Sequence, residues 1–154
     1  MDASASLVHS HARMSRSSVT VGLVDDEAPV RKALGRLLRA WGYEVEAYSS
    51  GGEFLDSLAG HKPDCSIVDL HLPGLSGLEV QQRLAQERIH LPCIIITGKD
   101  EPGVCERALA AGASAYLKKP LDGQSLLAAI KTALAEDDTD RATQESDQKF
   151  FSHS

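Results

Sequence analysis

The stretch VTVGLVDDEAPVRKALGRLL, residues 19–38, joins two different patterns without a break. Its β-branched first part, 19–24, predicts a buried strand, and this strand ends at two adjacent carboxylates, Asp25 and Asp26. Pro29 then favours the start of a helix, and apolar residues recur at helical spacing after it. The apolar stripe consists of Val30, Ala33, Leu34, Leu37, Leu38 and Trp41.

The same alternation of strand and helix patterns occurs five times along the chain. Such a rhythm predicts parallel strands joined by helices, and runs such as III at 94–96 suit strands that are covered on both faces. Gly42 and Gly112 are expected to end the first and fourth helices. The expected strands are 19–24, 43–48, 65–68, 92–97 and 114–117. The last helix is expected to bury Leu126, Leu127, Ile130 and Leu134.

Composition limits the classes of protein that need to be considered. The chain has 154 residues, of which 42% are hydrophobic, so it can bury one core of ordinary domain size. A net charge of −6 argues against a general nucleic-acid-binding surface. Neither an apolar run long enough to cross a bilayer nor a secretory signal is present, so we expect no membrane association and a cytoplasmic location. Cys65, Cys93 and Cys105 lack a C-x-x-C spacing and are expected to be buried thiols.

The domain organisation follows from shifts in composition. Residues 1–18 are small and polar without periodicity and are expected to form a disordered leader, and 19–135 form the folded domain. Residues 136–154 carry six acidic against two basic residues and are expected to form an acidic flexible tail. A DNA-binding helical domain needs on the order of 50 residues or more. Only 19 residues follow Ala135 here, and they are acidic, so we expect no direct DNA binding.

Polar residues stand at the ends of four expected strands. In an open parallel sheet the carboxyl ends of the strands meet at one rim, where ligands bind. Each residue alone would also suit a loop or a helix cap, but three carboxylates at one rim repel one another unless a cation is present. Mg²⁺ fits this need, and metal, carboxylate and lysine together indicate phosphoryl transfer. The residues are Asp25, Asp26, Asp69, Thr97, Lys118, Lys119 and Pro120.

Four segments carry a family resemblance. LVDDE at 23–27, DCSIVDLHLPGLSG at 64–77, IIITG at 94–98 and GASAYLKKP at 112–120 occur in this order. Together they resemble the receiver domain of two-component response regulators, the CheY-like family, over residues 19–135. The resemblance implies an α/β fold of the flavodoxin-like type. This fold is a single five-stranded parallel sheet in the order 2-1-3-4-5, flanked by five helices.

The resemblance also implies roles for the residues of the rim. Asp69 would be the phosphoacceptor, taking a phosphoryl group from a histidine kinase or a histidine phosphotransfer protein. Asp26, Asp69 and the backbone carbonyl of His71 would bind Mg²⁺ directly, and Asp25 would act largely through a metal-bound water. Lys119 would pair with Asp69 and then with a phosphoryl oxygen.

Two further residues would form the switch that such a domain uses. Thr97 would donate its hydroxyl to the phosphoryl group, and Tyr116 would swing inward with it. This movement would change the surface formed by the fourth helix, the fifth strand and the fifth helix, which is also a candidate face for a homodimer. The side chains of His71 and Lys99 would lie at the mouth of the pocket. The peptide bond before Pro120 resembles one that is cis in the family.

The sequence therefore favours a single-domain response regulator of a phosphorelay, with a downstream protein target. It would catalyse only its own phosphorylation and dephosphorylation and would not be an enzyme in the usual sense. The alternative is a receiver-like adaptor that binds proteins without phosphorylation. A phosphohydrolase that uses an aspartyl phosphate is disfavoured, because His71 stands where such enzymes have a second acid. A flavin carrier is disfavoured because Asp25 and Asp26 would repel its phosphate.

Overall fold

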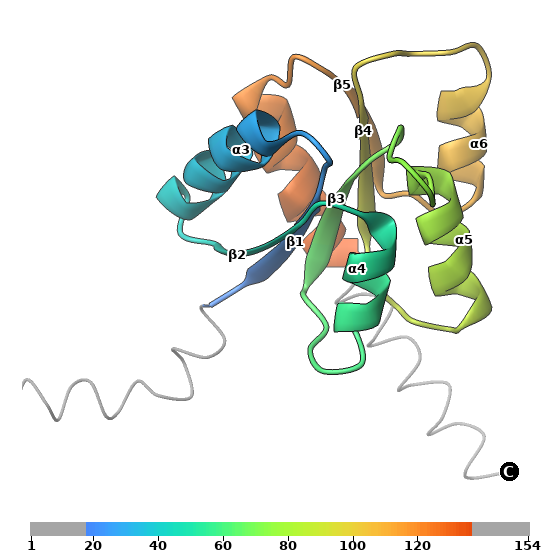
Figure 1. Ribbon diagram of the computed structural model, residues 1–154. Helices are drawn as coiled ribbons and strands as arrows, with labels where there is room; N and C mark the ends of the chain where they lie inside the picture. Colours follow the sequence, from blue (N-terminus) through green and yellow to red (C-terminus); the bar gives the residue numbers. More distant parts are fainter. Residues whose placement is uncertain (1–17, 137–154) are drawn as a thin grey trace, which may run out of the picture.

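The computed structural model describes residues 18–136. The expected leader and acidic tail lie outside this range, apart from Ser18 and Glu136. Strands and helices alternate along the described chain, as the sequence predicts (Figure 1). In chain order they are β1 (Thr20–Val24), α3 (Ala28–Ala40), β2 (Glu44–Tyr48), α4 (Gly51–Ser57), β3 (Cys65–Asp69), α5 (Gly77–Gln86), β4 (Cys93–Thr97), α6 (Val104–Ala110), β5 (Ala115–Lys118) and a final helix at 123–136.

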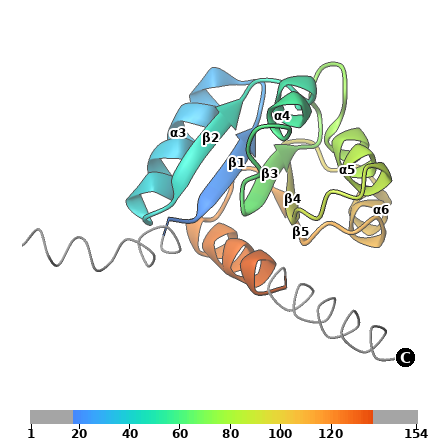
Figure 2. The ribbon, with the colours of Figure 1, turned by 90° about the horizontal axis from the view of Figure 1, so that it is seen from below.

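The five strands form one parallel sheet in the order β2-β1-β3-β4-β5, which confirms the expected topology (Figure 2). In the register of the central strands, Leu23 of β1 lies beside Ile67 of β3, which lies beside Ile94 of β4. The order reverses between β1 and β3, so the carboxyl ends of these two strands are neighbours. This is the place where a sheet of this type binds its ligand.

Helices cover both faces of the sheet, so that the molecule has three layers (Figure 1). Alternate residues of β4 belong to different cores, since Ile95 packs with α4, α5 and α6. Ile94 and Ile96 pack with α3 and the final helix. All three isoleucines are fully buried, which confirms that this apolar run is covered on both faces.

Some expectations about the helices were wrong in detail. Ala33 of α3 is exposed, because the buried stripe is centred on Leu34 and Leu38 and the short alanine side chain lies at its edge. In the final helix Leu127 and Leu134 are only half-buried, and Ala133, which the sequence analysis missed, is fully buried. A small residue suits that position because it lets the helix approach the sheet closely.

The two expected helix-ending glycines have positive φ, 97° at Gly42 and 108° at Gly112. A side chain at either position would be strained, so glycine favours the end of the helix there. Cys65 and Cys93 are buried without a disulfide, and burial raises the pKa of the Cys93 thiol to about 12. Cys105 is only half-buried, contrary to expectation. Between residues 18 and 136 no helix is long and apolar enough to cross a membrane.

One buried side chain in the core is incompletely satisfied. Gln81 of α5 is 5% exposed, and its Nε2 donates to the carbonyl of Ala108, 3.3 Å away. Its Oε1 has no hydrogen-bond partner within the described part of the chain. The Ala108 carbonyl also accepts from the amide of Ala113, at 3.0 Å, so it does not depend on Gln81. A buried acceptor without a partner lowers stability.

Replacing Gln81 with leucine is therefore expected to raise the free energy of unfolding, by about 1 kcal/mol. The substitution removes the unsatisfied oxygen and leaves the Ala108 carbonyl with a donor. Urea unfolding followed by circular dichroism measures the change. Gln82→Leu, at the exposed neighbouring position, is the control and should leave the midpoint nearly unchanged. A lower midpoint for Gln81→Leu than for the wild type would contradict the prediction.

Candidate functional site

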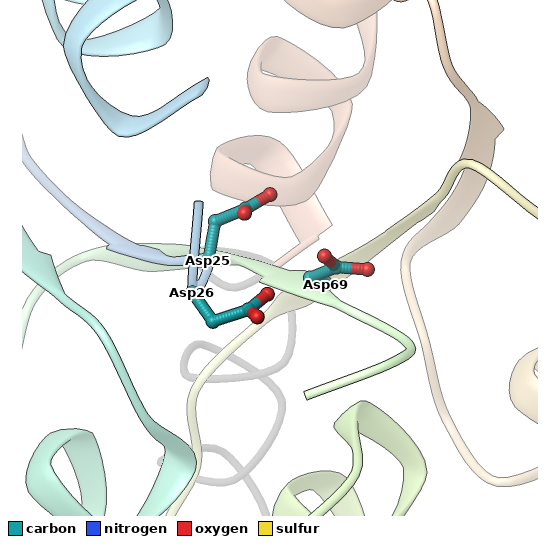
Figure 3. A group of neighbouring side chains, drawn as sticks. All are labelled: Asp25, Asp26 and Asp69. Atoms are coloured by element: carbon teal, nitrogen blue, oxygen red, sulfur yellow. The ribbon is translucent and has the colours of Figure 1, made fainter. Parts of the chain in front are cut away.

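Three carboxylates meet at the rim where β1 and β3 end (Figure 3). Asp25 and Asp26 follow β1, and Asp69 is the last residue of β3. Each offers an oxygen, and these oxygens lie within 4.8 Å of one another. Asp25 is fully buried and Asp69 is 5% exposed, whereas Asp26 is exposed. Two buried acids beside a third create a strongly negative site, as the sequence predicts.

Lys119, directly after β5, extends its ammonium group into this cluster. Its Nζ lies 2.9 Å from Oδ2 of Asp25, 3.2 Å from Oδ2 of Asp69 and 3.7 Å from Oε1 of Glu27. Burial by itself lowers the pKa of Lys119, but the hydrogen bond to Asp25 and the charge of Asp69 outweigh it and raise the pKa. The side chain is therefore charged at neutral pH and balances one of the negative charges of the site.

The backbone around Lys119 fixes this position. Its amide donates to the carbonyl of Thr97, 2.7 Å away, which ties the end of β5 to the end of β4. The peptide bond between Lys119 and Pro120 is cis. Lys118, which the sequence analysis places at the same rim, instead forms an exposed ion pair with Asp100 at 3.3 Å. Only Lys119 of the two neighbouring lysines reaches the carboxylates.

Backbone groups orient the two buried acids. The amide of His71 donates to Oδ1 of Asp69 at 3.1 Å, and the amide of Glu27 donates to Oδ1 of Asp25 at 2.9 Å. Arg31 of α3 donates through Nη1 to the Asp25 carbonyl, 2.7 Å away. Gly77 at the start of α5 lies so close that a Cβ there would meet the Asp69 carbonyl at 2.6 Å. The loops after β1 and β3 are thus held before any ligand arrives.

The carboxylates open onto a cleft of about 310 Å³. The side chain of His71 is exposed at this cleft, and its Nε2 lies 3.2 Å from the carbonyl oxygen of Lys99. His71 and Lys99 therefore bridge the loops after β3 and β4 across the opening, where the sequence analysis expects them. The cleft is lined by Asp26, Glu27, Asp69, His71, Gly98, Lys99 and Lys119.

Thr97 does not line the cleft. It is fully buried, and its hydroxyl donates to the carbonyl of Lys99 at 2.9 Å and accepts from the amide of Lys99 at 3.0 Å. Tyr116 of β5 is half-buried, and its hydroxyl donates to Oδ1 of Asp100 at 2.9 Å. Both expected switch residues thus contact the loop after β4 and not Asp25, Asp26 or Asp69.

Sequence reasoning missed three residues around the site. Glu27 directly follows the two acids in LVDDE, so its place in the motif could have indicated it. Arg31 lies on the first turns of α3, and its contact with the Asp25 carbonyl depends on how that helix sits on the sheet. Asp100 contacts side chains of β5, far along the chain, and no local pattern indicates such a contact.

The donor set suits a hard divalent cation. All of the acidic groups offer oxygen, and within residues 18–136 no histidine or cysteine joins them in the cluster. Mg²⁺ prefers oxygen ligands and is typically held by one or two carboxylates together with water and phosphate oxygens. The exposed Asp26 and the adjoining cleft leave space for such ligands. The residues present therefore fit Mg²⁺.

The strand order 2-1-3-4-5 is that of the flavodoxin-like α/β proteins, which include CheY, and such proteins bind ligands where β1 and β3 end. Comparison with protein families agrees, because the response regulator receiver domain matches residues 21–131. The chain belongs to this family, which consists of signalling proteins of two-component systems. The family resemblance seen in the sequence is thus confirmed.

Curated relatives show the same relationship. Nodulation protein W of Bradyrhizobium diazoefficiens is 38% identical over 134 residues, which are 87% of this chain and 59% of that protein. The transcriptional regulatory protein FixJ of Azorhizobium caulinodans is 32% identical over 117 residues, 76% of this chain and 56% of that protein. The chain thus spans between half and three-fifths of the length of these relatives.

Solved structures agree with the fold. The response regulator receiver protein from Burkholderia phymatum is 45% identical with a TM-score of 0.68, over 77% of this chain and 96% of that one. A CheY-like receiver domain protein from Methanospirillum hungatei is 29% identical with a TM-score of 0.74, over 80% of this chain and 99% of that one.

Proposed function

We propose that this receiver domain accepts a phosphoryl group on Asp69 from a histidine kinase or a histidine phosphotransfer protein. The observation that carries the proposal is the single ammonium group of Lys119 between Asp25 and Asp69, beside the third acid, Asp26. An oxygen of Asp69 would attack phosphorus and form an acyl phosphate as the bond from phosphorus to the donor histidine breaks. The leaving imidazole takes up a proton.

Mg²⁺, when bound by Asp26, Asp69 and the carbonyl of His71, would offset the charge that develops on the phosphoryl oxygens. Asp25 would act through a water bound to the metal. Lys119, whose Nζ lies 3.2 Å from Asp69, would pair with an oxygen of the phosphoryl group once Asp69 carries it. The amide of His71 keeps Asp69 in one orientation for the attack. Catalysis of this kind depends mainly on positioning and charge.

Thr97 would carry the signal away from Asp69. Its hydroxyl leaves the carbonyl of Lys99 and donates to the phosphoryl group, and Tyr116 turns inward with it. The surface of α6, β5 and the final helix changes as a result, and a downstream protein or a second copy of the chain binds there. This is a shift between two conformations that phosphorylation biases. Since the curated relatives are longer than this chain, the expectation of a single-domain regulator stays a prediction.

Incubation with acetyl phosphate and Mg²⁺ is expected to add one phosphoryl group to the wild-type protein, as measured by intact mass. Asp69→Asn and a sample with a chelator should show no gain, because the nucleophile or the cation is then absent. Asp56→Asn, at an exposed position of α4, is the matched control and should behave as the wild type does. A protein that gains no phosphoryl group under any condition would favour the phosphorylation-independent adaptor.

A further inference from the structure

Asp100, in the loop between β4 and α6, ties this loop to the edge strand β5 with both of its carboxylate oxygens. Oδ1 accepts from the hydroxyl of Tyr116 at 2.9 Å, and Oδ2 lies 3.3 Å from Nζ of Lys118. Tyr116 and Lys118 are two residues apart on β5, so their side chains point to the same face of the sheet. One carboxylate thus holds two side chains of the same strand.

The same loop holds the hydroxyl of Thr97. The Lys99 carbonyl accepts from Oγ1 of Thr97 at 2.9 Å and lies 3.2 Å from Nε2 of His71. The amide of Lys99 donates back to Oγ1 of Thr97 at 3.0 Å. Since Lys99 and Asp100 are adjacent, a loop fixed at Asp100 is also fixed where it holds Thr97. The hydroxyl must leave this carbonyl before it can reach a phosphoryl group on Asp69.

The protonation states of Tyr116 and Asp100 favour the hydrogen bond between them. Burial and then the hydrogen bond to Asp100 raise the pKa of Tyr116 to about 12. The hydrogen bonds from Tyr116 and then from Lys118 lower the pKa of Asp100. At neutral pH a protonated phenol therefore donates to a charged carboxylate. Hydrogen bonds to an ionised acceptor are shorter and stronger than neutral ones.

We propose that Asp100 is a positioning residue that holds Tyr116 and the loop at 97–100 in a resting arrangement, and thereby limits how readily Asp69 is phosphorylated. The inference rests on the proposed function, because it concerns the rate of that reaction. Asp100 stabilises one of two conformations, so its removal shifts the population toward the other. The effect acts through Thr97 and Tyr116, since Asp100 does not line the cleft around Asp69.

The test compares initial rates of phosphorylation by acetyl phosphate at saturating Mg²⁺. Asp100→Ala is expected to be faster than the wild type by about three- to tenfold, the factor that corresponds to the loss of one hydrogen bond. Removing a negative charge also helps an anionic donor to approach, so Glu101→Ala serves as the control. Glu101 is exposed in the same loop and carries the same charge without the bond to Tyr116. Glu101→Ala should change the rate of phosphorylation far less than Asp100→Ala does.

Tyr116→Phe separates the hydrogen bond from the charge. It removes the hydroxyl and leaves Asp100 charged and paired with Lys118. Because that exposed ion pair contributes little, Tyr116→Phe should raise the rate about as much as Asp100→Ala does. In the Tyr116→Phe background, Asp100→Ala should add no more than Glu101→Ala adds to the wild type. If the wild type is phosphorylated as fast as Asp100→Ala, the inference is wrong and the proposed function stands. The same holds if the effects of Asp100→Ala and Tyr116→Phe are additive. A wild type that gains no phosphoryl group overturns the proposed function and the inference with it.

Discussion

Replacing Lys119 with methionine is expected to slow phosphorylation of Asp69 by about 10²- to 10³-fold, the effect typical of losing one positioned donor to a developing charge. The same substitution should tighten Mg²⁺ binding. Nζ of Lys119 lies 2.9 Å from Asp25 and 3.2 Å from Asp69, so its positive charge competes with a cation for these oxygens. Methionine has a similar length and no charge. Rate and affinity should therefore change in opposite directions.

The rate is measured by intact mass over time with acetyl phosphate, and Mg²⁺ affinity by calorimetry. Lys131→Met, at an exposed position of the final helix, is the control and should leave both quantities unchanged. Circular dichroism confirms that each variant is folded. Weaker Mg²⁺ binding together with a normal rate in Lys119→Met would contradict the role given to this lysine.

Replacing Gly77 with alanine is expected to lower the free energy of unfolding by about 1–3 kcal/mol, the usual cost of an added methyl group in a tightly packed place. A Cβ at Gly77 would lie 2.6 Å from the Asp69 carbonyl and 3.0 Å from Cα of Leu70. Both atoms belong to the backbone, so the strand end or the start of α5 must move. Asp69 would move with it, and phosphorylation should slow as well.

Gly52→Ala is the matched control for this substitution. Gly52 also lies in the first turn of a helix, α4, but a Cβ there would meet no atom within 4 Å. Alanine favours a helix over glycine by about 1 kcal/mol, so Gly52→Ala should be neutral or stabilising. Urea unfolding of both variants gives the comparison. Equal stability of Gly77→Ala and the wild type would show that the loop after β3 is less tightly fixed than the structure indicates.

The sequence predicts the strands and the rim because local patterns determine them. The β-branched run at Ile94–Ile96 suits a strand covered on both faces, and the polar residues after each strand gather at one edge of a parallel sheet. Asp25, Asp26 and Asp69 could be placed at one rim for this reason, but that they are neighbours there followed only from the resemblance. The order of the strands, by contrast, came from the family resemblance, because periodicity does not determine which strands are neighbours.

Side-chain contacts between distant elements could not be predicted in the same way. The hydroxyl of Thr97 has partners both in its own loop and, in the proposed active state, at Asp69, and the sequence does not indicate which it takes. The bond between Asp100 and Tyr116 depends on how the loop after β4 lies over β5. Exposure of Ala33 depends on the rotation of α3 about its axis. Packing decides such features, and packing is a property of the whole fold.

The most direct test of the account identifies the residue that carries the phosphoryl group. The phosphorylated protein is treated with borohydride, which reduces an acyl phosphate of aspartate to homoserine, and its peptides are then sequenced by mass spectrometry. The account predicts homoserine at position 69 only, and none in a sample treated with a chelator before the phosphodonor is added. Homoserine at Asp25 or Asp26, or a phosphoryl group on His71, would contradict it.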